Sequence, residues 1–190
     1  MKKNSIVLAL MSLMLAAVML VAGCGYEPMK MDEKVFGGTT SSLTMLVPFE
    51  LRALSQNNTK QPNGSVINGY EGHNSDILVM VTALSYDKET MEKQSGKAWA
   101  MDLNSDAKRV ADNLKLKTKG STYQLEDVTV AGLPAKKAEI DYTANDIDLR
   151  MRVLCFAKGD ELWTVSVSAR RDNKDMDGEV QRIIESIKVN

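Results

Sequence analysis

The sequence has few of the residues that build disulfide frameworks and metal sites. Its 190 residues include two cysteines and one histidine, and the formal net charge is −1. Two cysteines cannot form a disulfide scaffold, and a single histidine excludes a multi-histidine metal site. The near-zero charge gives no electrostatic attraction to nucleic acid, so we expect no nucleic-acid partner. The length fits one domain with a hydrophobic core.

Apolar residues make up 44% of the chain, and they are concentrated at its start. Lys2 and Lys3 precede residues 6–22, in which Ser12 is the only polar side chain. A short basic start, an apolar stretch and a small residue at its exit are typical of a secretory signal. At 1.5 Å per residue this stretch could also form a marginal membrane span, so an uncleaved anchor is the alternative.

The residues at the end of this segment favour a cleaved signal peptide over an uncleaved anchor. Val21-Ala22-Gly23-Cys24 resembles the lipobox of bacterial lipoproteins, in which a diacylglycerol is attached to the cysteine thiol and the peptide is cut before it. The resemblance implies that residues 1–23 are a signal peptide and that Cys24 anchors the protein to a membrane on the extracytoplasmic side. Gly25 replaces the Asp associated with inner-membrane retention, which favours the periplasmic leaflet of the outer membrane in a cell with two membranes. In a cell with one membrane, the domain would face outward from the cytoplasmic membrane.

Removal of residues 1–23 would leave 167 residues with 22 basic and 25 acidic side chains, a net charge of −3. Residues 24–42 have mixed charge and no periodicity, and they contain Pro28 and the pair Gly37-Gly38. We predict that the acylated Cys24 is followed by a flexible tether, in which about 16 residues would reach about 20–24 Å. Residues 43–190 are predicted to form a single domain.

Hydrophobic periodicity predicts the elements of this domain. A period of two predicts strands, and a period of 3.6 predicts helices. The predicted strands are 43–47, 49–54, 66–71, 76–86, 125–130, 135–143, 147–157 and 161–169, and the predicted helices are 99–114 and 176–187. Residues 77–84 are apolar at both parities, so we expect a central strand covered on both faces. Because strands and helices do not alternate strictly, the pattern favours an α+β fold with a mostly antiparallel sheet flanked by helices.

The last two predicted strands suggest a hairpin and a polar surface. Placing their apolar faces opposite each other pairs Cys155 with Trp163, leaves residues 158–160 as the loop, and sets Asp148 opposite Arg170. The other face would then carry Arg150, Arg152, Ser166, Ser168 and Arg170. This face is either solvated sheet surface or a site where the arginines grip a carboxylate or phosphate of a ligand or partner.

Candidate catalytic residues are few. Cys155 lies in an apolar run, which favours a small buried side chain over a reactive thiol. His73 lies in a predicted loop, and no Gly-x-Ser-x-Gly motif supplies a nucleophile for it. The segment that starts at Asp172 has its glycine at position 7 of a calcium loop instead of position 6, and Ile183 stands at position 12, where the loop needs glutamate. We therefore expect Asp175 or Asp177 to cap the last helix. We therefore predict no catalytic, metal-binding or cofactor-binding residue, no cofactor, and no enzymatic activity.

Three segments resemble the PsbP-like fold, a group that includes DcrB-type lipoproteins of bacteria. They are Val130–Ala135, Gly159–Ser166 and the end of the terminal helix at Ile183–Val189. The resemblance implies an α-β-α sandwich, and it supplies no catalytic residue, because proteins of this group act mostly by binding partners. Together with the lipobox, it predicts a non-enzymatic lipoprotein that serves as a protein-interaction or envelope assembly module with an envelope protein partner. The alternative is a lipoprotein that binds a small anionic ligand on the arginine-bearing face.

Overall fold

Two antiparallel sheets and three helices form the part of the chain that the computed structural model describes, residues 26–55 and 57–190. The strands are β1 (Asp32–Gly37), β2 (Ser42–Val47), β3 (Arg52–Ala53), β4 (Thr59–Lys60), β5 (Val66–His73), β6 (Ile77–Ser85), β7 (Glu126–Val130), β8 (Leu133–Ala144), β9 (Ile147–Lys158), β10 (Glu161–Arg170) and β11 (Lys188–Val189). The helices are α2 (Lys88–Ser95), α3 (Leu103–Thr118) and α4 (Asp175–Glu185).

The large sheet has the strand order β3-β5-β6-β10-β9-β8-β7, with β4 also paired to β5, and the small sheet has the order β1-β2-β11. Every strand pair in both sheets is antiparallel. This confirms the predicted fold class, α+β with a mostly antiparallel sheet and flanking helices. Helix α2 was not predicted, because its eight residues bury no side chain and show no apolar stripe.

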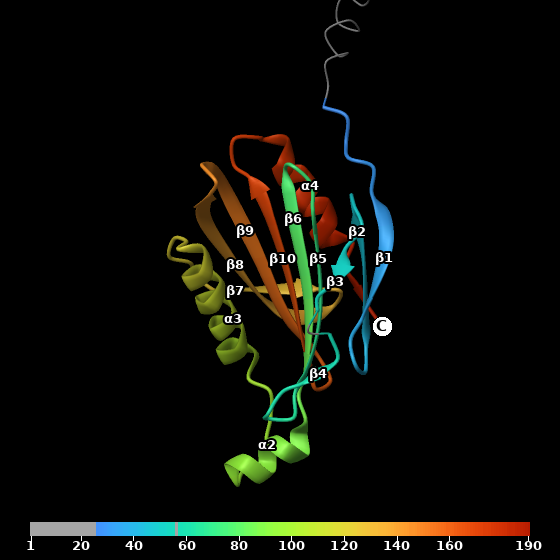
Figure 1. Ribbon diagram of the computed structural model, residues 1–190, viewed down its shortest axis with the longest axis vertical. Coiled ribbons are helices and arrows are strands. Elements are labelled where there is room, and N and C mark those ends of the chain that lie inside the picture. Colours follow the sequence, from blue (N-terminus) through green and yellow to red (C-terminus); the bar gives the residue numbers. More distant parts are fainter. Residues whose placement is uncertain (1–25, 56) are drawn as a thin grey trace, which may run out of the picture.

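The large sheet lies between two layers (Figure 1). Each of its faces carries a hydrophobic cluster. One face packs against α4 and the small sheet, and its cluster includes Trp163, Phe156 and Ile183. The other face packs against α3, where Ala107 and Ala111 lie close to the sheet together with Cys155. Small residues on α3 let the helix approach the strands closely, so β8 and β9 are buried on this side as well.

The predicted register of the β9–β10 hairpin is wrong by one residue. Trp163 pairs with Phe156, and Thr164 pairs with Cys155. The turn between the strands consists of Gly159 and Asp160 alone, and Gly159 has φ +60°. Because both faces of the large sheet are buried, β9 carries apolar residues at both parities, and parity alone could not select the register.

The tether predicted over residues 24–42 is wrong for part of that range. Residues 32–37 form β1, which pairs along its length with β2, and Phe36 belongs to the larger hydrophobic cluster. The cap predicted for α4 is also wrong, because neither Asp175 nor Asp177 accepts a hydrogen bond as a cap. Instead, the side chain of Asn173 accepts from the Asp175 amide.

Candidate functional site

Arg150 and Arg152 lie on β9, on the face of the large sheet that packs against α4. Arg150 donates to both carboxylate oxygens of Asp141, over 2.8 and 3.2 Å. Arg152 donates to Glu139 over 3.2 Å and to Asp177 at the start of α4 over 2.6 Å. Both guanidinium groups are therefore engaged with carboxylates of this same chain.

Of the remaining three residues of the predicted surface, the two serines lie on the other face of the sheet, whereas Arg170 lies near Arg150 and Arg152 at the end of β10. Ser166 and Ser168 project from the opposite face of β10 and are buried beneath the α3 side. Arg170 ends β10 and donates to both oxygens of Asp172, over 2.9 and 2.6 Å, so its predicted ion pair with Asp148 is wrong. The corrected register explains this separation, because a shift of one residue moves one strand's side chains to the other face.

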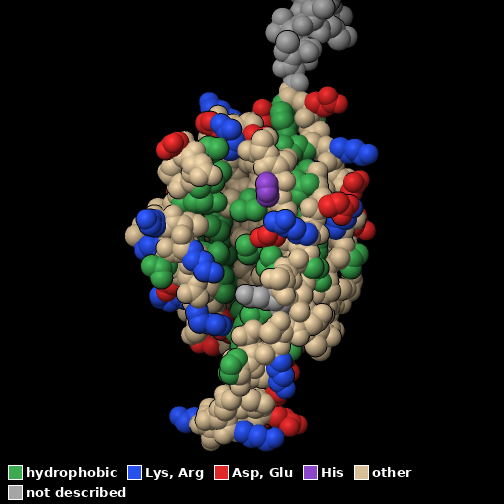
Figure 2. Space-filling model, in the orientation of Figure 1, with side chains coloured by type: hydrophobic (Ala, Val, Ile, Leu, Met, Phe, Trp, Pro, Cys, Tyr) green, Lys and Arg blue, Asp and Glu red, His purple; other side chains and the backbone are tan. Residues whose placement is uncertain are grey.

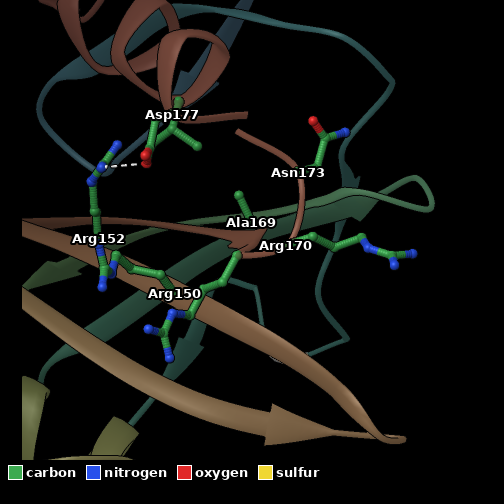
Figure 3. Close-up of a pocket in the computed structure, with 8 residues that line it drawn as sticks. Arg150, Arg152, Ala169, Arg170, Asn173 and Asp177 are labelled. Carbon is green, nitrogen blue, oxygen red and sulfur yellow. Dashed lines mark hydrogen bonds and ion pairs between the residues drawn. The ribbon is translucent and has the colours of Figure 1, made fainter. Parts of the chain in front are cut away.

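A cavity of about 170 Å³ remains between the arginines and the start of α4, and Arg150, Arg152, Arg170 and Arg171 line it. Figure 3 shows Arg152 turned toward Asp177 and Arg170 pointing away from it. Each of the four arginines has a carboxylate within 4.0 Å. The hydrogen bond from Arg150 lowers the pKa of Asp141, so this ion pair persists at neutral pH. An incoming anion would have to displace these carboxylates to bind the arginines.

A second candidate site lies on the α3 side of the large sheet. Helix α3 packs on β8 and β9, and none of the described helices lies over the neighbouring part of the sheet on β10, β6 and β5. We call the depression between α3 and these strands the open groove. Its floor consists of Ile67, Met80, Thr82, Leu84, Leu162, Thr164 and Ser166, and Val110 and Leu114 form the wall on α3.

The open groove encloses about 290 Å³, and Arg109 and Lys117 stand at its rim. A neighbouring depression of about 300 Å³ lies further along the same face, where Leu78, two residues before Met80, pairs with Ser168, two residues after Ser166. Figure 2 shows hydrophobic side chains gathered in a hollow that runs between α3 and the strands beside it. The predicted coverage of residues 77–84 on both faces is therefore right for one face of β6 only.

The lining of the open groove has the composition of a binding surface. Apolar side chains dominate its floor and wall, and Thr82, Thr164 and Ser166 contribute hydroxyl groups to the floor. Neither Cys155 nor His73 contributes to its lining. An apolar segment with a few hydrogen-bonding groups is the kind of partner that such a surface accommodates.

The two residues considered for nucleophilic catalysis are not placed together. Cys155 is buried, burial raises the pKa of its thiol to about 11, and its sulfur lies 3.8 Å from Thr164 Oγ1. His73 is exposed at the end of β5 and borders the neighbouring depression, which Cys155 does not line. Within residues 26–55 and 57–190, no group of three or more histidine, cysteine, aspartate or glutamate residues is arranged to hold a metal ion.

Sequence reasoning missed a buried glutamate at the start of β10. Glu161 is fully buried, and its carboxylate accepts hydrogen bonds from the amides of Thr39, Thr40 and Ser41 and from the hydroxyls of Ser41 and Ser85. Gly38 lies so close that a Cβ there would be 2.7 Å from Glu161 Oε2. This contact, which we call the Glu161 clamp, attaches the β1–β2 turn to the large sheet.

A second buried carboxylate, Glu179, lies on α4 and is 2% exposed. It accepts from the Tyr26 hydroxyl over 2.9 Å and from the Met29 amide over 3.1 Å, and Arg182 Nη1 lies 2.7 Å from it. The sequence holds a signal for this residue, because Glu179 follows Met176 by three positions and precedes Ile183 by four, on the apolar side of the helix. A charged residue at such a position predicts a buried partner.

The lipobox residues and Cys24 lie outside the described residues. Within the part that the structure describes, no helix has the length and apolar character needed to cross a membrane. Lipidation of Cys24 therefore stays a prediction from the sequence.

Comparison with known proteins finds similar solved structures only. No protein-family model matches the chain, and no curated protein sequence matches it. LpqN of Mycobacterium tuberculosis, a protein involved in cell envelope biogenesis, is 14% identical over 84% of this chain and 91% of LpqN, with a TM-score of 0.41. The Ran-binding protein Mog1p of Saccharomyces cerevisiae is 14% identical over 83% of this chain and 95% of Mog1p, with a TM-score of 0.42. PA94 of Pseudomonas aeruginosa, a protein of unknown function, is 11% identical over 81% of this chain and 94% of its own, with a TM-score of 0.38.

Proposed function

We propose that this chain is a lipoprotein acylated on Cys24, and that its domain acts without catalysis on the extracytoplasmic side of a membrane as an interaction module of the cell envelope. The lipobox supports the anchor. The open groove carries the proposed mode of action, because one face of the large sheet presents apolar side chains that no helix of the described chain covers. The partner that fits this surface is an envelope protein with an apolar segment.

The anchor is tested by mass spectrometry of the protein purified from membranes. The expected N-terminal peptide begins at Cys24 and carries the mass of a diacylglycerol, and a Cys24→Ala variant is expected to lose both the lipid and membrane association. An N-terminal peptide that begins at Met1 in membrane-bound protein would support the uncleaved anchor instead.

The interaction is tested by site-specific photocrosslinking in intact cells at native expression. A photoreactive residue at Met80, on the groove floor, is expected to capture one envelope protein. The same residue at Leu116, which is 79% exposed on α3 outside the groove lining, serves as the matched control. The purified partner should bind the wild-type domain and lose affinity for a Thr82→Arg variant, which fills the groove with charge. Equal capture from both positions, or unchanged affinity of the variant, would contradict the proposal.

A second function, binding of a small anion, is favoured by the cavity that four arginines line. The carboxylates that already engage these arginines oppose it. A thermal shift with phosphate or small dicarboxylates that disappears in the Arg150→Gln and Arg152→Gln variants would favour this function. Unchanged melting temperatures with all of these anions would rule it out for them.

A further inference from the structure

The first described residues of the chain are fixed to the domain. Tyr26 donates its hydroxyl hydrogen bond to Glu179, and the Met29 amide donates to the same carboxylate oxygen. Partial burial and the neighbouring Glu179 carboxylate raise the pKa of Tyr26 to about 12, so the hydroxyl remains a donor at neutral pH. We call these two hydrogen bonds to Glu179 the N-terminal latch.

The latch is continuous with the hydrophobic core. Met29 and Met31 are partly buried against the larger hydrophobic cluster, and β1 begins at Asp32. Glu179 itself is buried and is held from the other side by Arg182. The chain is therefore attached to the domain at Tyr26, Met29 and Met31, whereas the sequence pattern predicted a free tether as far as residue 42.

We infer that the N-terminal latch holds the domain directly against the membrane, with the Tyr26 end facing the lipid headgroups. This inference rests on the proposed acylation of Cys24. Two residue steps separate Cys24 from Tyr26, and they span at most about 7 Å when fully extended. The predicted tether would instead have allowed about 20–24 Å. The partner of this end of the domain is the lipid headgroup surface.

The latch also defines which end of the domain is remote from the membrane. In Figure 1 the chain enters beside α4, at the end of the molecule opposite to α2. The β5–β6 turn lies at the same end as the β10–α4 connection, since the Arg170 amide donates to the Asp76 carbonyl. Strand β6 runs from that end to α2 over about 26 Å. The open groove follows β6, so it lies along the side of the anchored domain and stays accessible to a partner.

Charge at the membrane end does not supply the attachment. Arg171 and Lys174 lie close in sequence to Asp172 and Asp175 in the β10–α4 connection, so neither sign dominates. A basic patch would attract anionic lipids, but Arg170 and Arg171 at this end are paired with the carboxylates of Asp172 and Asp141. The orientation therefore depends on the short connection between the acylated cysteine and the latch, and it should not depend on the lipid charge.

The inference is tested with full-length acylated protein in vesicles of phosphatidylethanolamine and phosphatidylglycerol that carry a headgroup quencher. A fluorophore is attached to Ser75→Cys in the β5–β6 turn or to Gln94→Cys on α2, both exposed positions. Cys155 is buried with a raised pKa and should not compete for the label. The label at residue 75 is expected to be quenched several-fold more than the label at residue 94. Equal quenching at both positions would overturn the inference.

Two variants separate the latch from the anchor. A Gly/Ser insertion of about 16 residues between Gly25 and Tyr26 restores a reach of about 20–24 Å and should remove the difference between the two labels. Tyr26→Phe, which keeps the ring and removes the hydroxyl, should speed hydrogen exchange at the Met29 amide several-fold and reduce the difference. Unchanged quenching in the insertion variant would count against the latch. Loss of vesicle flotation by the wild type would instead show that the proposed acylation has failed.

Discussion

At the scale of single residues, the Glu161 clamp shows how a buried charge is stabilised by the chain that surrounds it. Burial acts to raise the pKa of Glu161, but the hydrogen bonds from Ser41, Ser85, Thr40 and Thr39 outweigh it and hold the pKa below its usual value. The ionised carboxylate therefore stabilises the folded state at neutral pH, and this stabilisation is lost as the pH falls.

Replacing Glu161 with Gln should lower the free energy of unfolding by about 2–3 kcal/mol at pH 7, because the amide cannot accept hydrogen bonds at both ends. An unfolded glutamate titrates near pH 4.3, and the folded pKa lies lower, so the wild type loses this advantage as the pH falls through that range. Urea unfolding at pH 7 and at about pH 3 should show the difference shrinking. Glu89→Gln, on exposed α2, is the control and should change neither value. A difference that is the same at both pH values would contradict the role of the ionised group.

The thiol of Cys155 should be inert in the folded protein. Burial raises its pKa to about 11, so little thiolate forms at pH 8, and solvent does not reach the sulfur. Iodoacetamide should label Cys155 only after denaturation, as measured by mass spectrometry, whereas the engineered Gln94→Cys should react at once. Rapid native labelling of Cys155 would indicate that the α3 layer opens and would revive the reactive-thiol interpretation.

At the scale of elements, the β9–β10 hairpin shows that hydrophobic periodicity predicts strands but not their register. The existence and bounds of both strands were predicted to within two residues, because long alternating runs favour strands. The register was wrong because Leu154 and Phe156 face α4 while Cys155 and Val153 face α3, and both sets are buried. The sequence pattern could not show that a helix layer covers each face.

Replacing glycine with alanine should lower stability in the β9–β10 turn and raise it in α4. Gly159 occupies the two-residue turn with φ +60°, so Gly159→Ala should cost about 1–2 kcal/mol of stability. Gly178 lies within α4, where an added Cβ meets nothing within 4 Å, so Gly178→Ala should stabilise by about 0.5–1 kcal/mol. Thermal unfolding of the two variants tests both expectations. Destabilisation by both would mean that α4 does not tolerate added bulk.

The segment before β2 shows why part of the site escaped prediction. Residues 25–42 carry mixed charge with no periodicity, which is typical of a tether. Their order comes from contacts distant in sequence, Tyr26 with Glu179 and Thr39 with Glu161. Such contacts leave no local pattern, so only the isolated acidic residues in apolar surroundings could have indicated them.

At the scale of the whole molecule, the uneven coverage of the large sheet is the feature that sequence patterns could not supply. The pattern of β6 predicted burial on both faces, and the structure confirms this on the α4 side only. Helix α3 covers β8 and β9 and stops short of β6, which leaves Met80 and Leu84 in the open groove. Where a helix lies across a sheet depends on packing between layers, which the period of either element does not encode.

Alanine substitutions at two adjacent residues of β6 should therefore affect different properties, one the stability of the domain and the other its binding to the partner. Val79 is fully buried in the larger cluster, so Val79→Ala should cost about 2–3 kcal/mol. Met80 lines the groove and is partly exposed, so Met80→Ala should cost about 1 kcal/mol or less.

Because Met80 would contact the partner, its substitution should weaken binding of the captured envelope protein about tenfold, or about 1.4 kcal/mol. Folded Val79→Ala protein should bind with wild-type affinity. If Met80→Ala leaves the affinity unchanged, the groove is not the contact surface, and if it destabilises the domain as much as Val79→Ala, the groove is closed in solution.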